Sequence, residues 1–363
     1  MGVIGCGDVA HRRYLPVIES ARGLVELAGL CDLRREAVER TSRLVAPWAS
    51  VVPAFTDLGA MLRDLALDAV FNLTPAPLHA RVSQACLEAG VHVYSEKPIA
   101  STLADADRLV QTAHNGGPLL LCAPANAATR RIAWLSEIVS SGRYGRLTLG
   151  VAQYADPGPA AWREYTGDPA VFYGPEVGPV HDHGVYRLHA LTTLMGPVRL
   201  VQAMGTIAVP HRRVRAGRRA GQVVEVTAPD HVLMNLEFSS GALGQLLSSS
   251  AAVASLAPWL ELHFERATLS FHEDQYDKDS AASLYLDDET SLGIQGWLHG
   301  VRPPPPPEPM PTVETGAMHF IECLRGEARP LLSAEQARHV LDVILKAYRS
   351  IADGKAHETE TTF

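Results

Sequence analysis

The sequence lacks any run of 18 apolar residues and has no charged segment followed by an apolar leader. We therefore expect neither a membrane span nor a signal peptide. Positive charge is also scarce, since the formal net charge is −8 at pH 7 and no long basic run occurs. The nearest approach to one is HRRVRAGRR (211–219), which we interpret as a solvated hairpin rather than as a site for a polyanion. This charge pattern argues against bulk electrostatic binding to nucleic acid.

Cysteine is scarce as well, and the five thiols lie far apart, mostly inside apolar runs (Cys6, Cys31, Cys86, Cys122 and Cys323). An odd number of scattered thiols argues against a disulfide framework and is typical of a reduced protein, so we predict a cytoplasmic location. At 363 residues, of which 47% are hydrophobic, the chain is long enough for two domains with a core each.

The first 125 residues alternate apolar, strand-like runs with helical stretches. Strands are predicted at 25–32, 68–75, 91–98 and 118–124, and helices at 9–22, 34–45, 77–89 and 101–114. Near-continuous apolar strands separated by helices indicate a parallel sheet that is covered on both faces. Only Met1 precedes the glycine-rich segment, so the first strand is nearly absent, and we expect the true start to lie upstream.

After about residue 145 the strand-like runs mostly follow one another without helices between them. They are predicted at 147–154, 198–205, 231–238 and 241–249, with a tight turn at 239–241. We expect a largely antiparallel, open sheet with helices on one face. An amphipathic helix is predicted over 334–351. The run PPPPPEPMP (303–311) predicts a stiff connector, and a site for a proline-binding partner is the less favoured alternative.

A dinucleotide fingerprint, GxGxxG/A, is present in GCGDVA (5–10). Gly5 would permit the tight turn from strand to helix, and Gly7 would let the backbone approach a pyrophosphate. Asp8 and Val9 would then open the helix whose N-terminal amides hold that pyrophosphate. Because glycine-containing turns are common, the pattern alone is weak, and its context has to support it.

That context includes Asp32, which ends the next predicted strand, where an acid must sit to hydrogen-bond the adenosine ribose. A carboxylate there repels a 2′-phosphate, so we favour NAD over NADP. Arg34 and Arg35 lie close by and soften that preference. A helix-capping role for Asp32 is the alternative.

Two further segments carry candidate chemistry. Lys97, with Glu96 as its electrostatic neighbour, lies at the carboxyl end of a predicted parallel strand, where ligands bind in open α/β sheets. If residues 180–195 are helical, Asp182, Tyr186 and His189 share one face. A phenol can relay a proton to or from an alcohol, and Lys97 is a candidate cation beside it.

Alternatives exist for the second segment. A metal site built from Asp182 with His181, His183 and His189 is disfavoured, because the spacing matches no standard zinc pattern, and we expect no metal. His183, His189 and Trp162 are predicted to contact substrate. A satisfied helix-face histidine is the competing interpretation for His189, and ordinary loop packing is the competing interpretation for Trp162.

Taken together, three segments resemble the Gfo/Idh/MocA oxidoreductase family: GVIGCGDVAHRRYLP (2–16), NLTPAPLHARVSQACLEAGVHVYSEKP (72–98) and GPVHDHGVYRLHALTTLMG (178–196). The resemblance implies a Rossmann domain followed by an α+β domain with a large, mostly antiparallel open sheet. It maps Lys97 onto the family lysine, and it maps Thr74, Pro75 and His79 onto positions that line the cofactor. It also places Glu96 and Lys97 beside the cofactor.

The family's second motif is Asp, any residue, Gly, any residue, His. Here it reads Asp182-His183-Gly184-Val185-Tyr186. Tyr186 replaces the commoner His, as in the glucose–fructose oxidoreductase and dihydrodiol dehydrogenase branches, and Lys97 with Tyr186 remains a workable acid–base pair. His189 stands where a further acid is often found.

We therefore predict an NAD(P)-dependent oxidoreductase, with NAD preferred, that interconverts a secondary alcohol and a ketone on a sugar, cyclitol or related polyol. Residues 1–124 would form the domain that binds the dinucleotide, and residues 125–363 would form the domain that binds the substrate. The second domain would also form a homodimer or homotetramer through its C-terminal sheet. Its C-terminal helix can pack back on the first domain. Lys97, Tyr186 and Asp182 would be catalytic. Alternatives are a redox-neutral, NAD-dependent glycosidase and a non-catalytic dinucleotide-binding regulator.

Overall fold

The structure is a computed structural model that describes all residues except 115–116, 164–166, 175–176, 273–280, 288–295 and 304–311. Apart from Pro303, the predicted polyproline connector therefore lies outside the described residues. Two compact units are present: Met1–Ala128 with Met310–Leu341, and Thr129–Pro309 with Asp342–Phe363. The boundary predicted after residue 124 stays a prediction. In the described part of the chain, no helix is long and apolar enough to cross a membrane.

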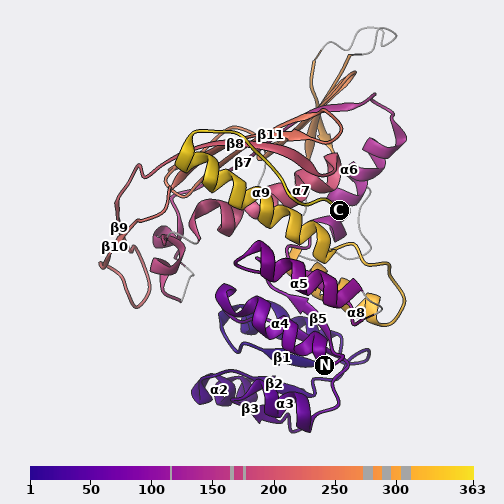
Figure 1. Ribbon diagram of the computed structural model, residues 1–363, viewed down its shortest axis with the longest axis vertical. Coiled ribbons are helices and arrows are strands. Elements are labelled where there is room, and N and C mark those ends of the chain that lie inside the picture. The colour runs from indigo at the N-terminus through magenta and orange to yellow at the C-terminus, as the bar shows by residue number, and fades with distance from the viewer. Residues whose placement is uncertain (115–116, 164–166, 175–176, 273–280, 288–295, 304–311) are drawn as a thin grey trace. The chain divides into compact units, whose positions relative to one another are not determined.

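A parallel sheet forms the centre of the first unit, as predicted (Figure 1). In the described chain it has six strands, ordered β3-β2-β1-β4-β5-β6. They are β1 (Gly2–Ile4), β2 (Gly29–Cys31), β3 (Ala54–Phe55), β4 (Ala69–Asn72), β5 (His92–Ser95) and β6 (Leu120–Cys122). Every residue of β1, β2, β4 and β6 is buried, which explains why these strands read as continuous apolar runs.

Helices connect these strands as expected of βαβ units. They are α1 (Leu15–Ser20), α2 (Arg35–Val45), α3 (Leu58–Asp64), α4 (His79–Glu88) and α5 (Leu103–His114), and α8 (Thr312–Leu324) joins the unit from the C-terminal part of the chain. The three-residue β1 pairs with both β2 and β4, so the shortened first strand still lies inside the sheet. Gly2 and Gly29 leave room there, since a Cβ on either would lie within 3 Å of Met61 on α3.

The second unit contains a nine-stranded sheet in its described residues, ordered β16-β15-β14-β13-β7-β12-β11-β8-β17. Its strands are β7 (Leu147–Ala155), β8 (Val198–Thr206), β11 (His231–Phe238), β12 (Leu243–Ser249), β13 (Leu260–Phe264), β14 (Ala267–Phe271), β15 (Ala282–Leu286), β16 (Leu298–Val301) and β17 (His357–Glu358). β7 and β12 pair in parallel, and the other described neighbours pair antiparallel. The mostly antiparallel open sheet is therefore confirmed.

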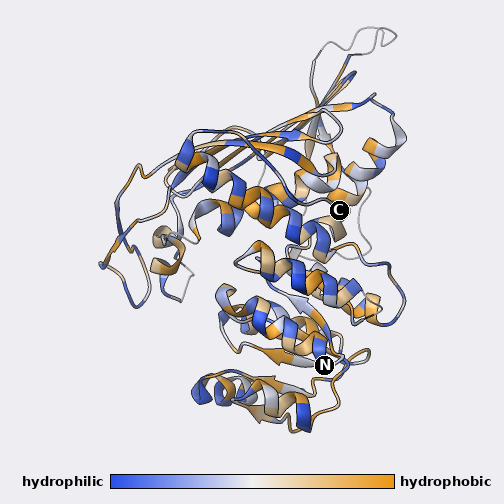
Figure 2. Ribbon diagram, in the orientation of Figure 1, coloured by the Kyte–Doolittle hydropathy of each residue, from blue (hydrophilic) through white to orange (hydrophobic). Residues whose placement is uncertain are grey.

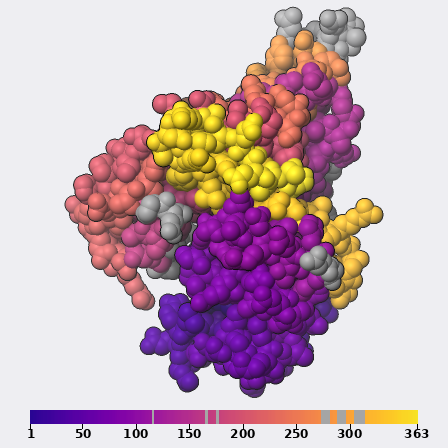
Figure 3. Space-filling model, in the orientation of Figure 1, coloured from indigo at the N-terminus to yellow at the C-terminus, as the bar shows by residue number. Residues whose placement is uncertain are grey.

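The turn predicted at 239–241 joins β11 to β12, where the Phe238 amide donates to the Ala242 carbonyl at 2.9 Å and Gly241 has a φ of +82°. Helices α6 (Arg130–Ser141) and α7 (Val185–Met195) and the second half of α9 (Ala334–Asp353) cover one face of this sheet (Figure 1). Figure 2 shows that α9 alternates apolar and polar residues along its length, as the amphipathic prediction requires. The last residues of the chain, which include β17, lie on the surface of this unit (Figure 3).

The basic segment 211–219 forms one side of a separate hairpin of β9 (His211–Arg213) and β10 (Val223–Glu225). The prediction of a hairpin is therefore confirmed. Arg212 is not solvated, however: its side chain is only 11% exposed and pairs with the buried Asp230 at 3.0 Å. All five cysteines are free, and four of them are buried.

Candidate active site

Three strand ends place the predicted residues of the first unit at one edge of the parallel sheet. Ile4 of β1 is in register with Asn72 of β4, which is in register with Ser95 of β5. The glycine loop, Thr74 and Lys97 all follow these residues. The carboxyl ends of parallel strands share one edge, and open α/β sheets bind their ligands at that edge.

The two loop glycines have different roles. Gly5 has a φ of +95°, and a Cβ there would lie 2.5 Å from the carbonyl of Leu73, so the turn requires glycine. Gly7 has no atom within 4 Å of its Cβ position and leaves an open surface above the backbone. This arrangement fits a cradle in which backbone amides approach a pyrophosphate. Val9 is 41% exposed beside it, and the Asp8 carboxylate accepts a 2.8 Å hydrogen bond from Arg12 Nε.

The helix after this loop contains a π-helical segment near its start. Residues Ala10–Tyr14 form the π-helical segment η1, and α1 begins at Leu15. The helix predicted over 9–22 is therefore confirmed, with a π-helical segment inside it. Single π-helical turns occur frequently at functional sites.

Asp32 anchors the glycine loop. Its Oδ2 accepts a 2.9 Å hydrogen bond from the Cys6 amide, and its Oδ1 accepts one of 2.9 Å from the Arg34 amide. The N-cap of α2 is Arg34, without a side-chain cap, so Asp32 does not cap that helix. Oδ2 keeps a second lone pair for a ribose hydroxyl, whereas Oδ1 also accepts Arg34 Nε at 3.4 Å. Arg34 itself is 72% exposed.

His79 is a buried bridge and does not offer its ring to a ligand. One ring nitrogen contacts the Pro98 carbonyl and the other the Thr74 carbonyl, both at 2.7 Å, and the residue is 2% exposed. Burial lowers the pKa of His79, while the two carbonyls and Glu96 oppose that lowering. His79 thus ties the loop of Thr74 and Pro75 to the turn after Lys97. Thr74 is also held by a 2.7 Å bond from its hydroxyl to Asn72 Oδ1.

Glu96 holds the backbone of Lys97. Its Oε2 accepts the Lys97 amide at 3.1 Å, and its Oε1 accepts the hydroxyl of the fully buried Tyr14 at 2.6 Å. Lys97 is partly exposed, and the Lys97–Pro98 peptide bond is cis. Tyr14 was not identified from the sequence, since its partner lies 82 residues away.

In the second unit, residues 180–195 are helical throughout: the π-helical segment η6 (Val180–Gly184) is followed by α7 from Val185. A Cβ on Gly184 would lie 2.9 Å from Ser248 Oγ, so glycine lets this turn approach β12 closely. Ser248 also donates a 2.9 Å hydrogen bond to the Pro179 carbonyl.

Four predicted residues meet in one cluster. Asp182 is 8% exposed, and its Oδ2 lies 3.5 Å from His183 Nε2. The His183 ring stacks on Tyr154 at 4.1 Å, meets the ring of Trp162 edge to face at 5.3 Å and lies 6.0 Å from the ring of Tyr186. We call these five residues the aromatic cluster. Tyr154 was not found from the sequence, because only the sheet brings it to this motif.

The remaining histidines of the segment lie elsewhere. His189 is buried at 5% exposure, and its carbonyl accepts the Thr193 hydroxyl at 2.7 Å. His181 contacts the Val177 carbonyl at 2.9 Å and stacks on Tyr348. Across the described residues, no group of three or more His, Cys, Asp or Glu side chains is arranged to hold a metal ion.

Two family models match most of the chain. Residues 1–122 match a family model described as "Oxidoreductase family, NAD-binding Rossmann fold", and residues 132–270 match "GFO/IDH/MocA C-terminal domain". A dTDP-3,4-didehydro-2,6-dideoxy-alpha-D-glucose 3-reductase from Actinomadura kijaniata is 38% identical over 33% of this chain, which is 35% of that enzyme's length. A scyllo-inositol 2-dehydrogenase (NADP(+)) from Bacillus subtilis is 23% identical over 96% of this chain and 93% of its own.

Among solved structures, levoglucosan dehydrogenase in complex with NADH and L-sorbose superimposes with a TM-score of 0.80. The match covers 99% of this chain and 98% of that one at 17% identity. At that identity the likeness establishes the shared fold.

Proposed function

Because this chain belongs to the Gfo/Idh/MocA family of oxidoreductases, it is an NAD(P)-dependent oxidoreductase of sugars or polyols, and we propose that Lys97, Tyr186 and Asp182 carry its acid–base chemistry. The reaction interconverts a secondary alcohol and a ketone. The aromatic cluster is the observation that supports this proposal best, because it combines an acid, a phenol and flat apolar rings that suit a sugar.

The residues of the first unit fit the cofactor. The open surface at Gly7 and the amides after it would hold the pyrophosphate, and Asp32 would accept ribose hydroxyls. NAD(P), when bound, supplies the acceptor or donor of hydride. The Asp32 carboxylate would repel a 2′-phosphate, so we propose that NAD is preferred. Arg34 pairs with Asp32 only through Nε, at 3.4 Å, and its exposed terminal nitrogens could meet a 2′-phosphate, so we propose that NADP is tolerated.

Each catalytic residue has its own task. Tyr186 transfers the proton of the reacting hydroxyl, and Lys97 polarises the same oxygen or shares the proton. Asp182, buried beside His183, orients the substrate by accepting hydrogen bonds from neighbouring hydroxyls. Trp162 and His183 form the wall of the sugar site, and His79 and Glu96 hold the backbone around Lys97.

A screen of neutral polyols and sugars for reduction of NAD⁺ and NADP⁺ tests the proposal. We expect turnover with at least one secondary alcohol. Sugar conversion without net formation of reduced cofactor would indicate redox-neutral chemistry instead. Dinucleotide binding without any conversion would contradict the catalytic assignment.

We also propose that the open face of the second sheet joins two copies of the chain. Met204, Leu233 and Leu243 project from β8, β11 and β12 and are 74%, 52% and 55% exposed. Leu233 is in register with Met204 on one side and with the partly buried Leu247 on the other, so these three side chains are contiguous, while Leu243 lies farther along β12. Large exposed apolar patches mark interaction surfaces.

We further propose a cytoplasmic location, which is in keeping with the five free thiols.

A further inference from the structure

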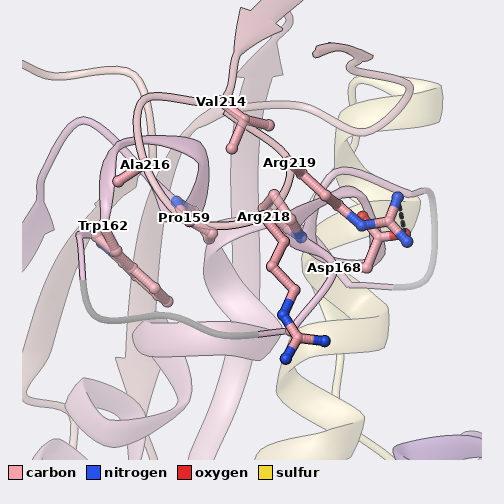
Figure 4. Close-up of a pocket in the computed structure, with 10 residues that line it drawn as sticks. Pro159, Trp162, Asp168, Val214, Ala216, Arg218 and Arg219 are labelled. Carbon is pink, nitrogen blue, oxygen red and sulfur yellow. Dashed lines mark ion pairs between the residues drawn. The ribbon is translucent and has the colours of Figure 1, made fainter. Parts of the chain in front are cut away.

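A pocket of about 250 Å³ opens in the second unit beside the aromatic cluster (Figure 4). It lies between the β9–β10 hairpin and the segment that contains η4 (Pro159–Ala161) and η5 (Pro169–Phe172). Its lining includes Pro159, Trp162, Asp168, Val214, Arg218 and Arg219. The hairpin carries the basic segment 211–219, for which a site for a polyanion was the less favoured prediction.

The walls of the pocket are anchored. Val214 and Ala160 belong to a small buried core with Tyr173, Val224 and Val226. The Tyr173 hydroxyl accepts the Ala160 amide at 2.9 Å, and the Arg215 amide donates to the Ala160 carbonyl at 2.8 Å. The hairpin is therefore fastened to the loop opposite it, and the pocket is a built feature of this unit.

The pocket carries a positive charge. Arg219 pairs with Asp168 at 3.0 Å, so these two charges offset each other. The side chain of Arg218 extends away from that pair (Figure 4), and the described residues show no ion pair to it. A planar guanidinium in such a position binds phosphate or carboxylate through two parallel hydrogen bonds.

Trp162 connects this pocket to the proposed catalytic residues. It lines the pocket with its ring, which also meets the His183 ring edge to face at 5.3 Å. Its Nε1 donates to Asp156 Oδ2 at 3.0 Å, which fixes the orientation of the ring. A molecule that occupies the pocket therefore lies against the wall of the aromatic cluster that contains Asp182 and Tyr186.

We propose that this pocket is a subsite for an anionic substituent, a phosphate or a carboxylate, carried by the sugar or polyol substrate. Sites for whole small molecules usually measure about 300–1,000 Å³, so a pocket of about 250 Å³ suits one part of a substrate. Arg218 holds the anion and Trp162 covers the adjoining sugar ring. The inference rests on the proposed function, since it names the class of substrate for the same site.

Calorimetric titration of the full chain with glucose 1-phosphate, glucuronate and glucose tests the subsite. The variants are Arg218→Ala and, as a matched control, Arg213→Ala, an exposed arginine of the same hairpin that does not line the pocket. We expect at least one charged sugar to bind about tenfold or more tightly than glucose. Arg218→Ala should remove about tenfold of that affinity, and Arg213→Ala should leave it unchanged. Tighter binding of glucose 1-phosphate would identify the substituent as a phosphate, and tighter binding of glucuronate would identify it as a carboxylate.

Equal binding of the three sugars, no binding of either charged sugar, or equal losses in the two variants would overturn the subsite. NADH binding and oxidation of neutral polyols, measured on the same preparations, report on the proposed function separately. An enzyme that binds NADH and oxidises neutral polyols while Arg218→Ala has no effect would keep the oxidoreductase assignment and lose the anion subsite.

Discussion

The hydroxyl of Tyr14 donates a 2.6 Å hydrogen bond to Glu96 Oε1 and so joins the turn after the glycine loop to the end of β5. The other oxygen of Glu96 accepts the Lys97 amide. One partly buried carboxylate thereby connects the turn after the glycine loop to the backbone of the proposed catalytic lysine.

Replacing Tyr14 by Phe should therefore lower the free energy of unfolding by about 1–3 kcal/mol, because a partly buried carboxylate loses its donor. Urea denaturation measures this change. Tyr285→Phe is the control, since Tyr285 is 39% exposed and the described residues show no hydrogen bond to its hydroxyl. Equal stability of the two variants would argue against a structural role for the Tyr14–Glu96 contact.

The two loop glycines should respond differently to alanine. Gly7→Ala meets no atom in the protein, so stability should change by less than about 0.5 kcal/mol while NADH binding weakens about tenfold or more, since the new methyl group occupies the pyrophosphate approach. Gly5→Ala should lose stability as well, because of its positive φ and the Leu73 carbonyl. Thermal unfolding and NADH titration separate the two effects. Unchanged NADH affinity in Gly7→Ala would contradict the proposed cradle.

Two histidines, the buried His319 and the partly buried His92, should make stability depend on pH. His92 Nδ1 accepts the Leu119 amide at 2.7 Å and His319 Nε2 accepts the Leu331 amide at 3.1 Å, so both rings must be neutral at these atoms. Burial lowers the pKa of His92 and of His319 below the usual value. The unfolded chain therefore binds more protons as pH falls through about 6.5, and the stabilisation present above that pH is lost below it.

Denaturation at pH 7 and pH 5 measures this loss. The double variant His92→Asn with His319→Gln keeps neutral acceptors and should show a smaller loss of stability than the wild type. His211→Gln, at an exposed position of β9, is the control. An unchanged pH dependence in the double variant would contradict the assignment of these two rings.

The exposed apolar residues of the open sheet predict self-association. Leu233→Lys should shift the protein to lower mass in light scattering, because it places charge in the middle of that face. Val51→Lys, at a fully exposed position of the first unit, should leave the mass unchanged. A wild type that is monomeric at micromolar concentration would contradict this interface.

The parallel sheet could be predicted because its strands are buried on both faces and read as continuous apolar runs. β3 could not, since two residues are too short to show a period. The strands β13 to β16 were not identified either. β13 has buried residues alternating with partly buried ones that include Glu261 and His263, and a five-residue run of this kind is a weak signal.

The site residues likewise divide into those that have a local sequence pattern and those that do not. The glycine loop, Asp32 and the motif around Asp182 have local patterns and were identified. Tyr14 and Tyr154 act through partners distant in sequence and have no local pattern. The π-helical segments η1 and η6 were not predicted either. The spacing of apolar residues in the sequence does not distinguish a helix with one inserted residue from a continuous α-helix.

Turnover of Lys97→Ala and Tyr186→Phe on a polyol that the wild type oxidises, measured beside their NADH affinity, tests the catalytic assignment most directly. Each variant should lose about 10²–10⁴-fold in kcat, the usual contribution of one acid–base group, and should bind NADH nearly as well as the wild type. Lys355→Ala, at an exposed position near the C-terminus, should keep full activity. Wild-type kcat in either variant would remove that residue from the chemistry.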